Sequence, residues 1–456
     1  MSGERTRQPV RVAAALLAAL VVLVAQLALV TVAGTDIPFH DQWDVEGRGL
    51  YPAMREGGAP LVAVIAPHNE HRIVWTHLLN RGIFAANGQW DPLVQQTAGA
   101  GLHAVIAGLL VWFLTVGLSA RPVWLAGAAV GLFSLPLVGW HNALWGFQSQ
   151  VYFAVGFAVG GFGLLASRES TLGRNIAGWL AVGASMLAMG PGLLAPVALG
   201  VFCLLRIREG AVRWSLLALA GLFSVGGWWL HAPVPVHAEL QSVTPTGFVI
   251  AFGRMLAWPH TGQPWAALVL NLPVAIVLFR RVVQKAPTAV AADFALLLAF
   301  WTILIAAGAA WSRGGGGEFG SGVPSRYADF MLLLPLANLG CVIALVHTAR
   351  QRWLAAAWGG FLLVGWAGIS AEVMRGIILP RASDRETPVR LVREFQRTGD
   401  AAVFIGQPRL LVPHPNPESV RAVLTDPRMR EALPPSLQPG QPMGPLSRGV
   451  RTLLGR

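Results

Sequence analysis

The chain has 456 residues, of which 54% are hydrophobic and only 12% are charged. Soluble proteins carry roughly a quarter charged residues, so this composition excludes an ordinary water-facing surface and indicates a protein of the lipid bilayer. The net charge of +12 comes from basic residues that lie mainly in short gaps between apolar runs, as in cytoplasmic loops of membrane proteins, and we therefore expect no nucleic acid as a partner.

A helix that crosses the hydrocarbon core needs roughly 20 mostly apolar residues. Val12 to Ala33 is such a run, and it is too long for a signal-peptide core, so we expect a retained first helix. Cys203 and Cys341 lie inside apolar runs and indicate neither a disulfide framework nor a cysteine metal site. Ten more membrane segments are predicted at 97–118, 122–139, 151–166, 176–189, 193–205, 214–230, 266–279, 291–311, 330–347 and 353–370.

The sequence thus predicts an all-α, polytopic integral membrane protein of the cell or inner membrane, with about eleven transmembrane helices. Segments 176–189 and 193–205 are short and joined by Gly190-Pro191-Gly192, so they are either two crossings or a re-entrant pair. The rest of the topology is the same in both cases.

The Lys/Arg bias between alternate loops predicts a cytoplasmic N-terminus and an extracytoplasmic C-terminus. We divide the chain into a transmembrane domain, residues 1–370, and an outer C-terminal tail or small domain, residues 371–456. The first outer loop, residues 36–96, is expected to contain amphipathic helices. Residues 231–263 and 312–326 form the other long outer loops.

Titratable side chains gather in the outer regions, beginning directly after the first membrane helix with Asp36, His40, Asp41 and Asp44. A carboxylate at this depth can act as a general base toward an acceptor hydroxyl. The alternative is that these acids only cap and solvate the helix end.

A second polar group follows in the same loop, where His68, Glu70, His71 and Arg72 fall within one short stretch. The imidazoles and the carboxylate are acceptable ligands for a divalent cation, although their spacing is not that of an established zinc motif. The metal therefore stays unknown. The alternative is a polar start to an interfacial helix over 73–86.

The last outer loop contains Arg313, a run of four glycines, and then Arg326 and Tyr327 as the next helix begins. Arginine beside the backbone N–H groups of a Gly-rich loop suits a phosphate. Glycine runs are also typical of flexible connectors, and Arg326 would equally suit an anchor to anionic headgroups.

The segment from Trp140 to Gln150 mixes aromatic side chains with amides and carries no Asp, Glu, Lys or Arg. Such a composition suits a sugar-binding platform, but an aromatic belt at the membrane interface has the same composition. We favour the belt.

These features resemble the GT-C glycosyltransferases, and among them the protein-mannosyltransferase and aminoarabinose-transferase group. The resemblance covers residues 12 to about 370 and matches Asp41 to the catalytic acid, with Asp44 second. It matches His68 to Arg72 to a polar patch before the second helix, and Arg326-Tyr327 to an Arg-Tyr pair leading into a late apolar helix. The usual Asp-Glu pair is replaced here by Asp41-Gln42-Trp43-Asp44.

The resemblance implies a glycosyltransferase that uses a polyprenyl-phosphate-linked sugar, with membrane lipids around it and an extracytoplasmic glycan, lipid or protein as acceptor. Asp41, Asp44 and Glu70 are the candidate catalytic acids. No cofactor beyond an optional divalent cation is expected, and the oligomeric state is left open. The alternatives are a transporter or flippase of a lipid-linked glycan and a non-catalytic assembly protein. The candidate substrate-binding residues are His40, His68, His71, Arg72, Arg313, Arg326 and Tyr327.

Overall fold

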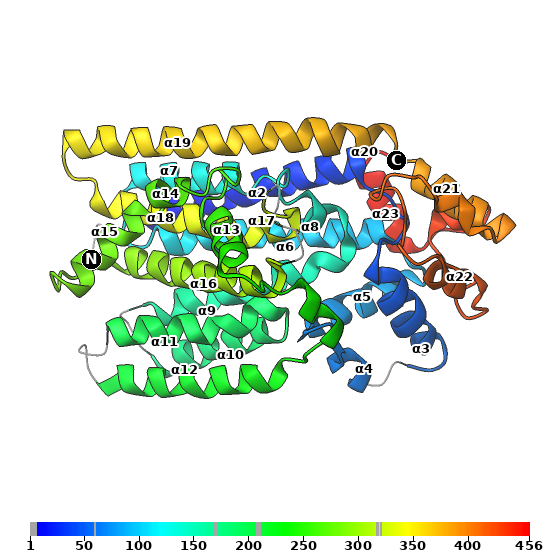
Figure 1. The fold of residues 1–456 in the computed structure, drawn as a ribbon, viewed down its shortest axis with the longest axis horizontal. Helices are drawn as coiled ribbons and strands as arrows, with labels where there is room; N and C mark the ends of the chain where they lie inside the picture. Colours follow the sequence, from blue (N-terminus) through cyan, green and yellow to red (C-terminus); the bar gives the residue numbers. More distant parts are fainter. Residues whose placement is uncertain (1–6, 59–60, 168–170, 207–210, 316–318, 320–321) are drawn as a thin grey trace.

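The computed structural model describes residues 7–58, 61–167, 171–206, 211–315, 319 and 322–456, and these form a mostly helical chain. The prediction of an all-α fold is confirmed. Figure 1 shows long helices running side by side as a bundle, with shorter helices collected at one end. Within the described residues the strands are β1 (Pro67–His68) and β2 (His71–Arg72), which form one small hairpin.

The bundle follows from the apolar runs, because a helix satisfies its own backbone hydrogen bonds and leaves apolar side chains to pack or to face lipid. Its helices are α2 (Arg7–Ala33), α6 (Pro92–Leu114), α7 (Ala120–Phe133), α9 (Ser149–Leu165), α10 (Leu172–Met186), α11 (Ala195–Leu205), α12 (Ala211–Leu230), α13 (Pro245–Leu256), α14 (Ala266–Leu270), α15 (Leu272–Val282), α16 (Val290–Arg313), α17 (Ala328–Met331), α18 (Leu333–Leu345) and α19 (Ala349–Val373). Between them lie α8 (Trp140–Leu144) and the 3-10 turns η2 (Gly146–Gln148), η3 (Gly190–Leu194), η5 (Pro235–Leu240) and η6 (Ser325–Tyr327).

Five helical stretches of the described chain are long and apolar enough to cross a membrane. Several of their apolar side chains are exposed, such as Leu16 on α2 and Val364 on α19, which suits a lipid surface better than water. The five stretches are Gln8–Ala33, Pro92–Leu114, Val290–Arg313, Ser325–Leu345 and Ala349–Ser383. These lengths support a membrane protein, and the predicted eleven crossings stay a prediction.

Helix length explains why five stretches are long enough to cross a membrane although eleven crossings are predicted. Each predicted apolar segment overlaps at least one helix, but α10 is shorter than a crossing normally requires, and segment 266–279 is split into α14 and α15. Proline in the first turn of α15 accounts for the split, because Pro273 has no backbone N–H to continue the preceding helix.

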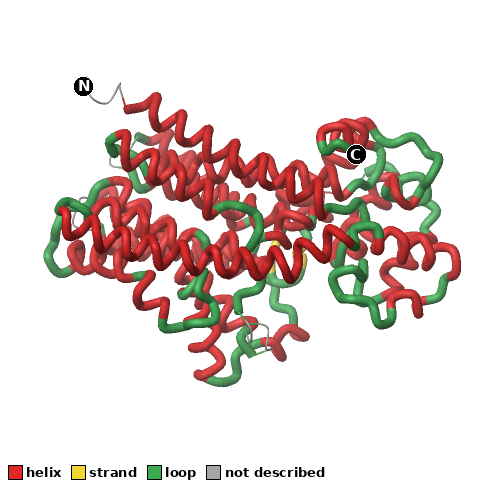
Figure 2. The backbone as a smooth tube through the Cα atoms, turned by 90° about the horizontal axis from the view of Figure 1, so that it is seen from above, coloured by secondary structure: helices red, strands yellow, loops and turns green. Residues whose placement is uncertain are grey.

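One end of the bundle is covered by residues 34–91 and 384–456, and we call it the capped end. Figure 2 shows from above the long helices on one side and short helices joined by loops on the other. The first loop contributes the π-helix η1 (Trp43–Leu50), α3 (Tyr51–Arg55), α4 (Leu61–Ile65), the hairpin and α5 (Val74–Asn87). After α19 come η7 (Met374–Ile378) and α20 (Leu379–Ser383). The C-terminal region then contributes α21 (Thr387–Thr398), η8 (Ala401–Phe404), α22 (Pro417–Thr425), η9 (Pro435–Leu437) and α23 (Pro445–Leu453) to the capped end.

The two parts of the capped end share one hydrophobic core. Trp43, Tyr51 and Trp90 from the first loop pack in the same cluster as Val392 and Phe395 from α21. Burial of these large side chains stabilises both parts together, so the C-terminal helices support the loop that carries the candidate site.

Candidate functional site

The candidate site begins where the chain leaves α2. His40 has a positive φ of 48°, and its backbone N–H donates to the carbonyl of Pro413 at 2.7 Å. The turn stacks the His40 ring on Phe39 at 3.9 Å and starts a helical segment that carries Asp41 and Asp44. The C-terminal region thus determines how the first acidic residues are presented.

The β1–β2 hairpin brings the second predicted group to the first. Asn69 takes the left-handed conformation in its turn, φ 49°, which asparagine tolerates better than most residues. The hairpin places the Nε2 atom of His68 3.3 Å from an Asp41 carboxylate oxygen. Two residues far apart in the loop therefore form an acid–imidazole pair.

Electrostatics keep Asp41 ionised. Burial opposes the charge, but the hydrogen bond with His68 and the electrostatic attraction of His68 and His414 outweigh it and hold the pKa of Asp41 below its ordinary value. Burial lowers the pKa of His40 to about 4, so this ring is neutral at physiological pH. The site thus holds a carboxylate beside imidazoles.

Glu70 forms a separate polar group at the other side of the hairpin. Its carboxylate accepts a hydrogen bond from Arg313 at 2.9 Å and contacts His237, whose Nδ1 lies 3.2 Å from the same guanidinium. Although burial opposes ionisation, the His237 hydrogen bond and the Arg313 charge hold the pKa of Glu70 below its usual value. The structure therefore brings Glu70 of the hairpin turn and Arg313 at the end of α16 together.

Asp44 does not face Asp41's partner. One Asp44 oxygen lies 3.1 Å from Nε2 of His414 and the other accepts from Arg48 at 3.1 Å. Asp41 and Asp44 are thus held by different partners, and Asp44 contacts the C-terminal region.

Two other predicted residues lie beside these groups without joining them. Burial lowers the pKa of His71 to about 4. The side chain also interacts electrostatically with His68, Glu70 and Arg313. Arg72 is directed away, and its guanidinium donates to the carbonyl of Ile65.

Arg326 and Tyr327 lie in η6, next to α8. The Arg326 guanidinium lies over the Tyr327 ring at 5.1 Å, and its backbone carbonyl accepts from Asn142 at 3.2 Å. Burial lowers the pKa of His141 to about 3, and the positive charge of Arg326 acts in the same direction. His141 therefore lies near Arg326 and His40, two of the predicted substrate-binding residues.

The aromatic segment around His141 lies inside the protein, so our preference for an interfacial belt was wrong. Trp145 and Phe147 are 7% and 0% exposed. Phe147 contacts the His68 ring at 5.1 Å, and Trp145 contacts Phe39 at 5.8 Å. These rings form an apolar floor beneath the Asp41–His68 pair, because the loop packs against the hairpin instead of against lipid.

Sequence reasoning missed several ionisable residues that the structure brings into pairs. His237 and His414 lie far from their acidic partners in sequence, and only their position in polar loops hinted at a role. Asp329 and His103 lie within apolar helices and face each other at 4.0 Å. The sequence feature that could have identified His103 and Asp329 is that each is an ionisable residue inside a membrane segment.

A metal is not indicated by geometry. Within the residues that the structure describes, no three His, Cys, Asp or Glu side chains are grouped closely enough to hold an ion. The divalent cation stays a prediction.

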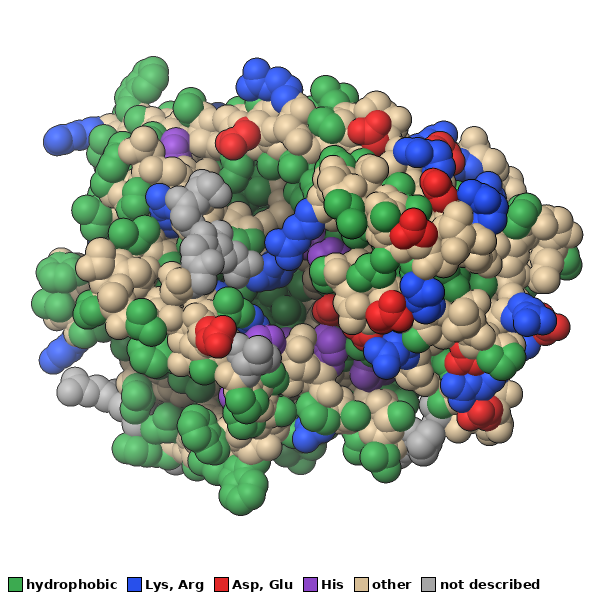
Figure 3. All heavy atoms as spheres, turned by 45° about the vertical axis from the view of Figure 1, so that its right-hand side comes forward, with side chains coloured by type: hydrophobic (Ala, Val, Ile, Leu, Met, Phe, Trp, Pro, Cys, Tyr) green, Lys and Arg blue, Asp and Glu red, His purple; other side chains and the backbone are tan. Residues whose placement is uncertain are grey.

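Figure 3 brings the capped end forward and shows a hollow in this face with basic, histidine and acidic side chains around it. A carboxylate, neutral imidazoles and guanidinium groups near an aromatic floor can accept a proton and hold an anion. No family model, no curated protein and no solved structure matches this chain.

Proposed function

We propose that the chain is a GT-C-like membrane glycosyltransferase that moves a sugar from a polyprenyl-phosphate carrier to an extracytoplasmic glycan, lipid or protein. In this proposal the helices make about eleven crossings, the N-terminus is cytoplasmic and the capped end is outside. The observation that carries the proposal is the contact of the Asp41 carboxylate with His68, directly after a helix long enough to cross the membrane.

The reaction needs a base and a stabilised leaving group. The Asp41 carboxylate accepts the proton of the acceptor hydroxyl as that oxygen bonds to the anomeric carbon. The bond between the sugar and its phosphate breaks, and the electron pair leaves with the phosphate. Arg326, near His141 and His40, supplies positive charge for the phosphate, and its planar fork suits phosphate oxygens.

The second polar group has a supporting role. Glu70 positions the Arg313 guanidinium at 2.9 Å and neutralises part of its charge, so Arg313 serves as a weaker phosphate contact than Arg326. Asp44, held by His414 and Arg48, is the alternative base. The aromatic floor supports the His68 ring that pairs with Asp41.

A transporter of lipid-linked glycans is the second candidate, favoured by the buried His103–Asp329 pair. A non-catalytic assembly protein with the same fold is the third. Reconstituted vesicles separate the three: sugar transfer to an acceptor supports the enzyme, movement of intact donor supports the transporter, and donor binding alone supports the assembly protein.

The decisive variant is Asp41→Asn in the full-length protein in vesicles containing a polyprenyl-phosphate-linked sugar. An amide of nearly the same shape cannot take the proton, so turnover should fall by about a hundred- to ten-thousand-fold while donor binding is retained. Asp384→Asn, at an exposed acid after α20, is the matched control and should keep full turnover. Near-normal turnover of Asp41→Asn would remove Asp41 as the base and make Asp44 the next residue to test.

A further inference from the structure

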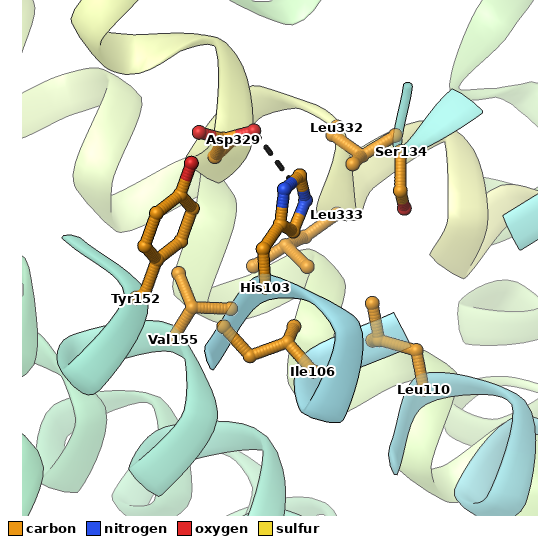
Figure 4. A pocket seen from close by; sticks show the side chains of 9 residues that line it. All are labelled: His103, Ile106, Leu110, Ser134, Tyr152, Val155, Asp329, Leu332 and Leu333. Carbon is orange, nitrogen blue, oxygen red and sulfur yellow. Dashed lines mark ion pairs between the residues drawn. The ribbon is translucent and has the colours of Figure 1, made fainter. Parts of the chain in front are cut away.

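Five polar side chains converge inside the bundle, below the candidate site. They come from different segments, and the His103 ring stacks on Tyr152 at 4.9 Å (Figure 4). At about 1.5 Å per residue, Gln26 lies roughly 10 Å before the capped end of α2, within a predicted crossing. The five are Gln26 of α2, His103 of α6, Asn142 of α8, Tyr152 of α9 and Asp329 of α17.

Hydrogen bonding determines which ring nitrogen of His103 carries a hydrogen. Gln26 donates its amide N–H to the Tyr152 hydroxyl, so its carbonyl oxygen is the group that faces Nδ1 of His103 at 2.8 Å. Nδ1 must therefore donate. In the neutral ring Nε2 is then an acceptor, and it faces an Asp329 oxygen at 4.0 Å.

Two acceptors that face each other repel unless a proton lies between them. The other Asp329 oxygen accepts from Asn142 at 2.7 Å, which leaves one oxygen toward His103. His103 is buried and the Asp329 side chain is only 11% exposed, and neither Tyr152 nor Gln26 carries a cation that would balance a carboxylate. An uncompensated charge in such surroundings is costly, so the pair is stable when it keeps one proton.

A small cavity lies between these groups. His103, Tyr152, Asp329 and Ser134 border it, and the buried Ser134 hydroxyl has no hydrogen-bond partner among the described residues. A water molecule there would bridge a distance that is too long for a direct hydrogen bond. Figure 4 shows the carboxylate and the imidazole facing each other across this space.

The surroundings allow access from one side. Asp329 lies one turn beyond Arg326, and Asn142 contacts both residues. The neighbouring His141 packs edge-on against Phe39 at 6.1 Å, which connects this segment to the capped end. On that side Arg326 precedes Asp329 by three residues, and His141 precedes Asn142 directly. Away from the capped end the cavity is bordered by the apolar side chains of Ile106, Leu110, Val155, Leu332 and Leu333.

We propose that His103 and Asp329 form a proton-binding site inside the membrane-spanning bundle, filled from the capped end. The bound proton resides on the Asp329 carboxyl and is shared with Nε2 of His103 through the cavity, because a neutral pair avoids separating two charges in an apolar interior. The apolar border makes it a site that binds a proton without passing it on to the opposite end. This goes beyond sugar transfer and does not depend on it.

Infrared spectroscopy of the full-length protein in lipid nanodiscs tests the proposal. At neutral pH the unmodified protein should show a carboxylic-acid C=O band that Asp329→Asn lacks. Asp293→Asn is the matched control, because Asp293 is a buried acid beside Arg206 at the other end of the bundle, and this variant should keep the band. Absence of any band that depends on Asp329 would overturn the proposal.

A second measurement covers the case in which Asp329→Asn does not fold. Isotopically labelled aspartate in the unmodified protein should shift the band, and raising the pH should remove it. His103→Gln should move the pH at which it disappears, because the imidazole shares the proton. A band that changes neither with the label nor with His103→Gln would contradict the proposal. Loss of the band on adding sodium chloride at constant pH would also contradict it, because it would indicate a site for a metal cation.

Discussion

Glu46 is the most heavily hydrogen-bonded acid of the capped end. Its carboxylate accepts from the side chains of Asn80 at 2.6 Å, Trp90 at 2.8 Å and Gln95 at 2.9 Å, and it also contacts Gln42 and Tyr51. These donors come from the residue before η1, from α3, α5 and α6, and from the chain before α6, so Glu46 joins the segment after Asp41 to the helix that follows the hairpin. Its role is structural support of the candidate site.

Glu46 predicts a pH-dependent stability. Burial raises its pKa from 4.5 to about 6, against the effect of its hydrogen bonds. A raised carboxyl pKa contributes stability below pH 4.5 that is lost as the pH rises through about 6, an effect of about 2 kcal/mol. The thermal midpoint of the unmodified protein, relative to Glu46→Gln, should therefore be greatest below pH 4.5 and decrease toward pH 7.

The remaining effects of Glu46→Gln do not depend on pH. The amide presents N–H groups to residues that are themselves donors, which costs about 1–3 kcal/mol at every pH. A difference between the two proteins that stays constant from pH 4 to pH 7 would show that Glu46 does not titrate in this range.

The α8–η6 junction shows how short elements place the proposed donor contact. The Ser325 hydroxyl donates to the carbonyl of Val138 at 2.7 Å and accepts from the backbone N–H of His141 at 3.1 Å. Asn142 adds bonds to the Arg326 carbonyl and to Asp329. The turn that carries Arg326 is thereby fixed to the segment that carries His141.

Variants of Arg326 test this junction. Arg326→Ala should weaken binding of a polyprenyl-phosphate donor, because the cation beside His141 is lost. Arg326→Lys should restore binding only in part, since an ammonium lacks the planar fork of the guanidinium. Equilibrium binding of a labelled donor measures both, and unchanged affinity in the two variants would leave Arg326 as a headgroup anchor.

At the scale of the whole molecule, the C-terminal helices hold the first loop onto the bundle. Arg451 of α23 pairs with Asp36 at 2.9 Å and also contacts Asp91, the N-terminal cap of α6. Burial and the nearby Asp36 raise the pKa of Asp91, while Arg451 opposes this effect. One guanidinium thus joins the end of α2, the start of α6 and the C-terminal region.

Removing this cation should be costly. Arg451→Ala leaves two buried carboxylates without their partner, and breaking such a pair typically costs about 3–5 kcal/mol. Arg448→Ala, an exposed residue on the same helix, is the control and should stay within about 0.5 kcal/mol. Thermal unfolding in detergent compares the two, and equal midpoints would show that the contact is dispensable.

The proposed orientation has its own test. Single cysteines at Gly57 and Gly440, both in the capped end, should react with an impermeant thiol reagent from outside intact cells. Cysteines at Gly173 and Gln284 should react only after permeabilisation, as the Lys/Arg bias of the loops requires. External labelling of Gly173 with protection of Gly440 would reverse the orientation and place the candidate site in the cytoplasm.

The sequence alone determined the features that follow from composition along the chain. Apolar runs such as Val12 to Ala33 predict helices wherever they occur, because the backbone must satisfy its own hydrogen bonds away from water. Local clusters, such as His68 to Arg72, also identified chemistry-bearing residues that the structure then placed near Asp41 and Arg313.

Tertiary structure decided which of those residues meet. Nothing local to His237, His414 or Asp329 distinguishes a partner of an acid from an isolated polar side chain, since their partners lie in other loops and helices. Trp145 and Phe147 have the composition of an interfacial belt, but Phe147 packs against the hairpin and Trp145 against Phe39, so both are buried. Contacts between distant segments depend on how helices pack, which the order of residues along one segment does not contain.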